Sequence, residues 1–433
     1  MQSVSSSMKV AVVGSGISGL AAAYRLGQSG HIVSLFEAAD YFGGHTHTVD
    51  VTLGELTYGV DTGFLVFNHK TYPNLVNLFD ELDIETVATD MSFSVKSRLP
   101  DRILEWSGGN LNTVFAQRRN LFSPRFLRML RDILRFNEEM TALALTPSHA
   151  ELAQTLGDYL IHYKFSAEFR DWYLLPMAGC IWSCPTAQML AFPLATFVRF
   201  CHNHGLLQVS DRPQWHTVKG GARYYVDKIL ASIADKRLNT PVLAISREQT
   251  DNVPKIKLNT QYGSEIFDHV VLAGHSDQSL RLLQDLTPLE RKLLSSIAYQ
   301  PNRAVLHTDD SCLPQNKKTW SAWNYQSKNG QEPQVCVHYL INKLQPLPFK
   351  ESVIVSLNPI DDPNPSKIIA TFDYAHPVFD SGAISAQQNL DQIQGQQNTW
   401  FAGAWTGYGF HEDGLKSGLA VAQSINARGS RDV

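Results

Sequence analysis

The sequence is poor in cysteine and has no strong excess of charge of either sign. Its five cysteines are Cys180, Cys184, Cys201, Cys312 and Cys336. So few cysteines, in an odd number, favour free thiols in a reducing compartment over a disulfide framework. A metal cluster around Cys180 and Cys201 would need a closed C-x-x-C pair, which is absent, so we predict no metal site. The net charge of -4 gives no support to binding of nucleic acid.

Long uninterrupted apolar runs are absent as well. The longest uncharged stretch, residues 172–198, contains Pro176, Pro185 and Pro193 together with several polar residues. This argues against a single membrane-spanning helix and favours broken helices that line an apolar cavity. The segment MQSVSSSM at the start lacks the basic region and the cleavage site of a signal peptide. We therefore expect a cytoplasmic protein.

Residues 9–37 carry the pattern of a nucleotide-binding βαβ unit. Residues 10–13 form an apolar run that predicts a buried strand, residues 20–26 predict a helix, and residues 32–36 predict a second strand. The turn after the first strand reads G-S-G-I-S-G, from Gly14 to Gly19. In such a turn the first glycine allows the tight bend, the second lets the backbone touch a pyrophosphate, and the third lets helix and strand pack closely. The free N–H groups of the helix then face the phosphates.

Glu37, at the end of the second strand, stands where an acidic side chain can accept hydrogen bonds from ribose hydroxyls. An acid rather than an Arg at this position argues against the 2′-phosphate of NADP, so the pattern predicts FAD or NAD. We find only one such glycine fingerprint, so a separate NAD site is not expected. Re-oxidation of a bound cofactor would then use oxygen, a quinone or a protein carrier.

Two further motifs, one near each end of the chain, complete a resemblance to a known family. Gly43-Gly44-His45 follows Glu37, and residues 402–414 read AGAWTGYGFHEDG before a helix expected at residues 415–425. With these motifs the chain resembles the flavin-containing amine oxidoreductase superfamily, which includes monoamine oxidases, phytoene desaturases and protoporphyrinogen oxidases. The likeness extends over nearly the full length. Many members have Arg where this chain has His45, and often Glu where it has Trp405.

The resemblance implies an α/β fold in which a Rossmann-like FAD-binding domain of the GR2 type carries an inserted α+β substrate domain. The FAD-binding domain is expected at residues 1–75, 215–275 and 396–433. The substrate domain is expected at residues 76–214 and 276–395. FAD is expected to bind non-covalently. The residues predicted to bind it are Gly14, Ser15, Gly16, Ile17, Ser18, Gly19, Glu37, Ala38, Gly43, Gly44, His45, Thr62, Gly63, Val242, Ala273, Gly403, Asp413, Gly414 and Leu415.

Short motifs narrow the resemblance to a bacterial subgroup associated with cyclopropane-fatty-acid synthases. These motifs are H-E-D-G at residues 411–414, the W-x-x-W-N-Y cluster at 320–325 and Y-A-H-P at 374–377. They imply an FAD-dependent oxidoreductase that moves a hydride from a hydrophobic substrate, a methylated or unsaturated fatty-acyl chain, to flavin N5. The alternatives are a flavin amine oxidase, a redox-neutral flavin isomerase and a non-catalytic flavin-binding protein.

A desaturation also removes a proton, so the chain should offer a base near the flavin. His376 and His411 are the candidates, with Tyr374 as an orienting or proton-sharing group. For each histidine the alternative is a structural, hydrogen-bonding role beside the flavin.

Residues 118–140 are strongly basic and amphipathic. Six arginines alternate there with apolar residues at near-helical spacing. Such a helix can lie on an anionic membrane surface, which would place the protein peripherally on the inner face of the membrane. The alternative is a solvated helix with one face in the core. The oligomeric state is left open.

Overall fold

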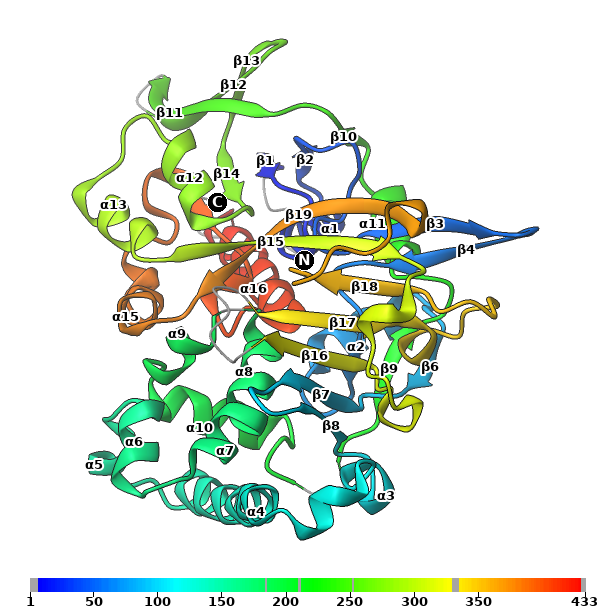
Figure 1. The fold of residues 1–433 in the computed structure, drawn as a ribbon. Helices are drawn as coiled ribbons and strands as arrows, with labels where there is room; N and C mark the ends of the chain where they lie inside the picture. Colours follow the sequence, from blue (N-terminus) through cyan, green and yellow to red (C-terminus); the bar gives the residue numbers. More distant parts are fainter. Residues whose placement is uncertain (1–6, 184, 209–211, 251–252, 329–334, 430–433) are drawn as a thin grey trace.

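A parallel sheet of five strands forms the upper part of the molecule in Figure 1. The computed structural model describes residues 7–183, 185–208, 212–250, 253–328 and 335–429. The strand order is β10-β2-β1-β14-β20. The strands are β1 (Lys9–Val13), β2 (Ile32–Phe36), β10 (Asp235–Arg237), β14 (His269–Leu272) and β20 (Thr399–Phe401). Segments far apart in the chain thus meet in one sheet, as a Rossmann-type fold requires.

The central strands of this sheet are buried on both faces, which explains their unbroken apolar runs. Val10 and Val12 pack on the side of helices α1 (Ile17–Gln28) and α16 (His411–Gly429). Ala11 lies in the cluster on the opposite side, together with residues of a three-stranded antiparallel sheet. That sheet consists of β11 (Val242–Thr250), β12 (Val253–Thr260) and β13 (Gly263–Phe267).

A mostly antiparallel sheet of seven strands lies beside this unit (Figure 1). Its order is β19-β15-β18-β17-β16-β7-β8, and only the pair β16–β7 is parallel. The strands are β7 (Phe93–Arg98), β8 (Ile103–Ser107), β15 (Ala298–His307), β16 (Trp323–Lys328), β17 (Cys336–Leu340), β18 (Ile354–Leu357) and β19 (Ile368–Val378). Alternating apolar and polar residues at 303–307, 335–340 and 353–357 predict three of these strands, which the structure confirms as β15, β17 and β18. The starts of β17 and β18 agree with the prediction to within one residue, whereas β15 begins five residues earlier.

Helices pack below the seven-stranded sheet in Figure 1. They are α4 (Pro124–Leu145), α5 (His149–Leu152), α6 (Leu156–His162), α7 (Ala167–Phe169), α8 (Leu175–Trp182), α9 (Thr186–Leu190) and α10 (Leu194–Asn203). Pro185 and Pro193 are the N-caps of α9 and α10, so prolines do break this apolar region into short helices. None of the described helices is both long and apolar enough to cross a bilayer.

The remaining elements join these parts. They are β3 (Thr48–Leu53), β4 (Leu56–Asp61), β5 (Phe67–Asn68), α2 (Pro73–Glu81), β6 (Thr86–Thr89), α3 (Leu111–Val114), β9 (Trp215–Val218), α11 (Arg223–Ala231), α12 (Ser276–Leu282), α13 (Pro288–Ser295), α14 (Ile341–Leu344) and α15 (Ser381–Gln388). The sequence of residues 58–68 predicts a strand around Asp61-Thr62-Gly63, whereas in the structure β4 ends at Asp61 and the next strand, β5, begins at Phe67. The α/β class and the Rossmann-type sheet are confirmed, while the domain boundaries stay a prediction.

Candidate functional site

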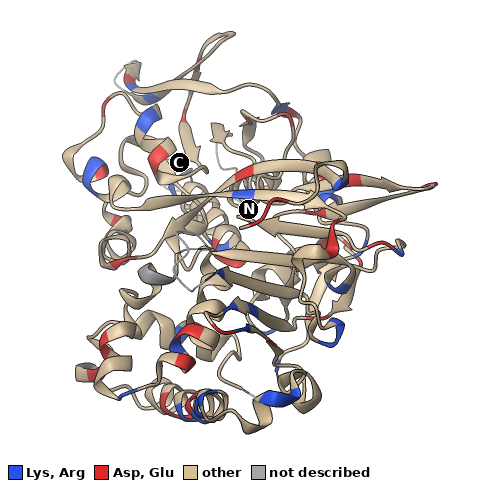
Figure 2. Cartoon of the chain, viewed as in Figure 1, with Lys and Arg blue, Asp and Glu red and all other residues tan. Residues whose placement is uncertain are grey.

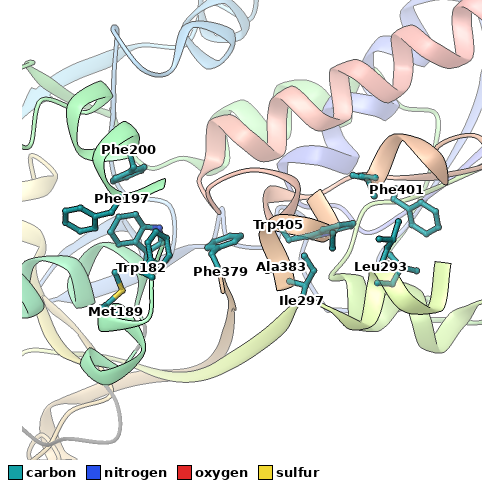
Figure 3. Packing of buried hydrophobic residues seen from close by; sticks show 14 of the residues in the cluster. Trp182, Met189, Phe197, Phe200, Leu293, Ile297, Phe379, Ala383, Phe401 and Trp405 are labelled. Atoms are coloured by element: carbon teal, nitrogen blue, oxygen red, sulfur yellow. The ribbon is translucent and has the colours of Figure 1, made fainter. Parts of the chain in front are cut away.

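A cavity of about 450 Å³ extends from the glycine turn after β1 to the aromatic side chains of α8 and α10. Its lining comes from the parallel sheet, from the seven-stranded sheet and from the helices below it. Figure 3 shows the apolar packing around one part of it: Trp182, Phe197 and Phe200 gather on one side, and Phe379 lies between them and Trp405. The cavity therefore joins a candidate nucleotide site to an apolar chamber.

The glycine turn has the shape that a phosphate-binding loop needs. Gly14 has φ +101°, and a Cβ on Gly19 would lie 1.9 Å from the carbonyl oxygen of Gly14, so neither position accepts a side chain without movement. A Cβ on Gly16 would meet no protein atom within 4 Å. Gly44, with φ +58°, brings its own Cβ position to 3.1 Å from the Cα of Gly16. The two glycine segments thus lie against each other beside an open space.

Glu37 closes this end of the cavity. Its Oε2 accepts hydrogen bonds from the backbone N–H of Ser15 at 2.9 Å and from the Ser15 hydroxyl at 2.5 Å. Its Oε1 accepts from the N–H of Ala39 at 2.9 Å. The carboxylate is therefore held next to the glycine turn, where a ribose would follow a phosphate.

His45 carries a buried polar atom without a partner. Its Nε2 has no hydrogen bond, although His45 lines the cavity directly after the glycine pair. Burial, together with the neighbouring His376, His275 and His411, holds the pKa of His45 well below its usual value, so the ring is neutral. A buried imidazole nitrogen that lacks a partner is suited to a hydrogen bond with a ligand.

The loop between β20 and α16 brings the start of α16 to the cavity. Residues 403–405 and 408–411 contribute to the lining. The indole N–H of Trp405 donates to the carbonyl of Gly274 at 3.2 Å, so this residue ties the loop to the end of β14. Asp413 accepts from the N–H of Phe410 at 3.0 Å, and burial raises its pKa to about 6. The helix N-terminus offers a positive dipole end at this wall.

His411 is fixed on two sides. Its Nε2 bonds the hydroxyl of Tyr225 at 2.7 Å, and its ring stacks on Phe64 with centroids 3.9 Å apart. Burial lowers the pKa of His411 to about 3. Its geometry therefore fits an orienting role better than that of a mobile base.

Tyr374 and His376, which are neighbours on β19, reach the cavity with different partners. The Tyr374 hydroxyl lies 2.8 Å from Thr62 Oγ1 and 3.2 Å from Nδ1 of His47, and burial raises its pKa. His376 Nδ1 lies 2.8 Å from Nδ2 of Asn302, and burial with His275 lowers its pKa to about 4. Both side chains are therefore neutral near pH 7.

The chamber beyond these residues is aromatic and carries no formal charge. Phe200 stacks on Phe410 with centroids 4.9 Å apart and lies 5.7 Å from Tyr408. Two further lining residues, Trp182 and Trp323, have buried indole N–H groups without a partner. Among the described lining residues none is Lys or Arg, and the only carboxylate is Glu37 at the opposite end.

Most of the residues predicted from the sequence come together here. Those that line the cavity are Gly14, Ser15, Gly16, Ile17, Ser18, Glu37, Gly43, Gly44, His45, Thr62, Gly63, Ala273, Gly403, Tyr374, His376 and His411. Those outside the lining are Gly19, Ala38, Val242, Asp413, Gly414 and Leu415, and their roles toward FAD stay predictions.

Some residues of the site gave no signal in the sequence. His47, Asn302 and Tyr225 each bond a predicted residue, but they lie far from it in sequence or outside any motif. Only the pairing of β15 with β19 brings Asn302 to His376. No group of three or more metal-ligating side chains occurs among the described residues, and Cys184 lies outside them.

Comparison with known proteins gives this cavity a context. The family model for flavin containing amine oxidoreductase matches residues 17–426. An L-amino-acid oxidase from Mus musculus is 27% identical over 299 residues, which are 66% of this chain and 44% of that protein. A 1-hydroxycarotenoid 3,4-desaturase from Flavobacterium sp. (strain P99-3) is 42% identical over 81 residues, 18% of this chain and 15% of that protein. The matches thus span less than half of the length of these relatives.

The fold is also that of a solved oxidase. A structure of putrescine oxidase bound to putrescine superposes with a TM-score of 0.71, at 17% identity, over 98% of this chain and 99% of the other. The residues present fit an FAD: the glycine turn leaves an open cradle, Glu37 stands beside it, and His45 has an unpartnered buried nitrogen.

Proposed function

This chain belongs to the flavin-containing amine oxidoreductase family, and from that premise we propose that it is an FAD-dependent oxidoreductase acting on an uncharged hydrophobic substrate, a fatty-acyl chain. The observation that carries the proposal is the aromatic chamber without a Lys, Arg or carboxylate among its described lining residues. A free carboxylate or a diamine would leave an unpaired charge in such a chamber, which is costly. An acyl chain would leave none.

FAD is the cofactor, and we propose that the nucleotide end of the cavity binds it. The turn from Gly14 to Gly19 and the N-terminus of α1 would hold the pyrophosphate, and Glu37 would turn from Ser15 to the ribose. His45 would donate a hydrogen bond where relatives often use Arg. When bound, the isoalloxazine supplies the acceptor for a hydride and returns to its oxidised form through a second substrate.

The chain's own residues would position the substrate and handle the proton. The aromatic lining would exclude water and align the acyl chain by contact. Tyr374, which bonds Thr62 and His47, could share a proton with these polar partners. We propose His376, Tyr374 and His411 as the polar groups nearest the chemistry, with His411 as the orienting one because Tyr225 and Phe64 fix it.

The test is anaerobic reduction of the holoenzyme by defined compounds. We expect bleaching of the flavin by neutral acyl esters or phospholipids with unsaturated or methylated chains, and a product two hydrogens lighter by mass spectrometry. Free amino acids and diamines should not bleach it. Bleaching by a charged diamine but by no lipid would overturn the proposal. A shifted double bond with unchanged mass would instead identify an isomerase.

Oxidation of a neutral amine is the second candidate. The cluster of Phe200, Tyr408 and Phe410 supports it, because an aromatic pair beside the flavin is typical of amine oxidases. Release of peroxide with simple monoamines, in the absence of any lipid turnover, would favour this function.

We also propose contact with an anionic membrane surface through the part of the molecule that holds α4. Phe122 is 86% exposed and Leu134 is 59% exposed. Arg128 and Arg131 flank them with side chains that are 50% and 73% exposed. Figure 2 shows both basic and acidic residues on α4. Several of the arginines do pair with acids, as Arg125 does with Glu168 at 2.7 Å, so apolar insertion would carry much of the binding.

Co-sedimentation with phospholipid vesicles tests this contact. Phe122→Asp should weaken binding to vesicles that contain phosphatidylglycerol by about tenfold or more, since burying a Phe side chain contributes about 1.5–3 kcal/mol. Tyr262→Asp is the matched control, because Tyr262 is 76% exposed on the distant β12–β13 hairpin. Equal binding of Phe122→Asp and the wild type would contradict the proposal.

A further inference from the structure

A ladder of side-chain amides runs across the seven-stranded sheet and ends at the cavity. It begins at Asn358, which has φ +47°, a conformation that Asn tolerates better than most residues. Its Oδ1 accepts from the backbone N–H of Arg303 at 2.9 Å, so the other end of the amide must be the NH₂ group. That NH₂ donates to the carbonyl of Val335 at 3.1 Å and to Oδ1 of Asn302 at 2.7 Å.

The orientation of the Asn302 amide determines which nitrogen of His376 accepts a hydrogen bond. Because its Oδ1 accepts from Asn358, its Nδ2 donates, to the carbonyl of Gln300 at 3.0 Å and to Nδ1 of His376 at 2.8 Å. Asn302 is only 2% exposed, so water does not offer it another partner. Hydrogen bonds to backbone groups fix the orientation of both amides. Turning either amide by 180° would bring its NH₂ group against a neighbouring N–H or NH₂ group, so that two donors would face each other.

From this ladder we infer that His376 is held as the tautomer with its proton on Nε2, and that it serves the cavity as a neutral hydrogen-bond donor rather than as the base. Nδ1 accepts from Asn302 and is not available to the cavity. Nε2 already carries a proton and has no lone pair to accept another, so the ring could become an imidazolium only by protonation at Nδ1, which already accepts the hydrogen bond from Asn302. Asn302 and Asn358 are then positioning residues for His376.

The surroundings of His376 keep it in this state. The ring lies 5.2 Å from that of His45 between centroids, and burial, followed by the proximity of His275, disfavours its protonation. None of the groups acting on it is a carboxylate. A buried N–H donor that does not change charge can stabilise negative charge as it develops on a ligand atom. The proton lost by a substrate would then have to reach another group.

The role in turnover rests on the proposed oxidoreductase function, whereas the tautomer does not. The first test therefore uses the apoprotein. In protein labelled with ¹⁵N-histidine, with His376→Gln for assignment, His376 should show a protonated Nε2 and an unprotonated Nδ1. A protonated Nδ1 in the wild type would overturn the inference, whatever the enzyme turns over.

Asn302→Asp tests the ladder. A carboxylate there can only accept, so it should draw a proton to Nδ1 of His376 and change its ¹⁵N signature. Asn112→Asp is the matched control, because Asn112 is an exposed amide that already accepts a hydrogen bond, from Arg118. If Asn302→Asp left the His376 signals as in the wild type, Asn302 would not set the tautomer.

Two substitutions of His376 separate donor from base in the holoenzyme. Gln keeps an N–H but cannot act as a base, whereas Ala removes both. For a donor, the rate of flavin reduction should fall by about 10²-fold or more in His376→Ala and by roughly tenfold or less in His376→Gln. Equal large losses in both variants, with a wild-type rate that titrates with His376, would show a base instead.

Discussion

Gly16 differs from the other two glycines of the turn, because no neighbouring protein atom requires it to lack a side chain. Gly14 and Gly19 meet neighbouring backbone where a Cβ would be placed, so their substitution would disturb the turn itself. At Gly16 a Cβ would meet no protein atom within 4 Å, and the position lines the cavity. The same residue type in one motif therefore serves two different purposes.

Gly16→Val should accordingly give a folded protein that does not retain FAD. The added methyl groups would occupy the space of the pyrophosphate and remove the close approach of backbone to phosphate. Gly27→Val is the control, because Gly27 lies on α1, the helix that Gly16 caps, also has no atom within 4 Å of its Cβ position, and is outside the cavity lining. Absorbance of the bound flavin and circular dichroism measure both properties. A fully yellow Gly16→Val protein would refute the assignment of the pyrophosphate site.

At the scale of elements, one buried ion pair joins three parts of the nucleotide-binding side. Arg247 on β11 bonds Glu290 on α13 at 2.5 Å, and the two side chains are 5% and 2% exposed. Arg247 Nε also donates to Thr399 Oγ1 on β20 at 3.0 Å. Glu290 in addition completes the capping box of α13 with Thr287. Helix start, antiparallel sheet and parallel sheet thus depend on the same two charges.

Glu290→Gln should therefore destabilise the protein far more than loss of a surface pair. Removing the Glu290 charge leaves the buried Arg247 with only Asp285, at 3.6 Å, as a counter-ion, and because breaking a buried pair costs about 3–5 kcal/mol we expect a loss toward the lower end of that range. Glu85→Gln breaks the pair between Lys219 and Glu85, whose side chains are 52% and 69% exposed, and should change the stability little. Urea unfolding of the apoproteins measures both. Similar midpoints for the two variants would show that the buried pair is dispensable.

For the whole molecule, local sequence patterns predict the glycine-turn end of the cavity, whereas the pairing of distant strands determines the remainder of the site. The glycine turn, the strands beside it and Glu37 lie within residues 9–37, so their relation can be read from adjacent positions. The link between Asn302 and His376 instead depends on the register of β15 and β19. The uncharged chamber depends on side chains from several strands and helices that no local spacing brings together. Periodicity reports which residues are buried, but not which of them face the same cavity.

Many buried histidines make the stability of the whole molecule depend on pH. Burial lowers the pKa of His269, His307 and His376 to about 4 and that of His338 and His411 to about 3. In the unfolded chain each of these histidines has a pKa of about 6.5 and therefore takes up a proton near that pH. Between that pH and the folded pKa values the unfolded state holds more protons, so stability is present above pH 6.5 and is lost as the pH falls.

Two buried carboxyl groups have the opposite effect on the pH dependence of stability, and they reduce the loss of stability on acidification. Burial raises the pKa of Asp61 to about 7 and that of Asp413 to about 6, so acid favours the folded state at these two groups. The five histidines outnumber the two carboxyls, and the pKa of His45 is lowered as well, so unfolding takes up protons in this range and stability falls below pH 6 by about 1.4 kcal/mol per pH unit for each proton taken up.

Urea unfolding of the apoprotein between pH 7 and about pH 5 measures this slope through the linkage relation. His269→Gln should make the slope shallower by up to one proton, because Gln can still accept the hydrogen bond from Trp400 but does not titrate. His162→Gln, at an exposed histidine on α6, should leave the slope unchanged. Stability that stayed constant or rose on acidification would show that the histidines are not neutral in the folded state.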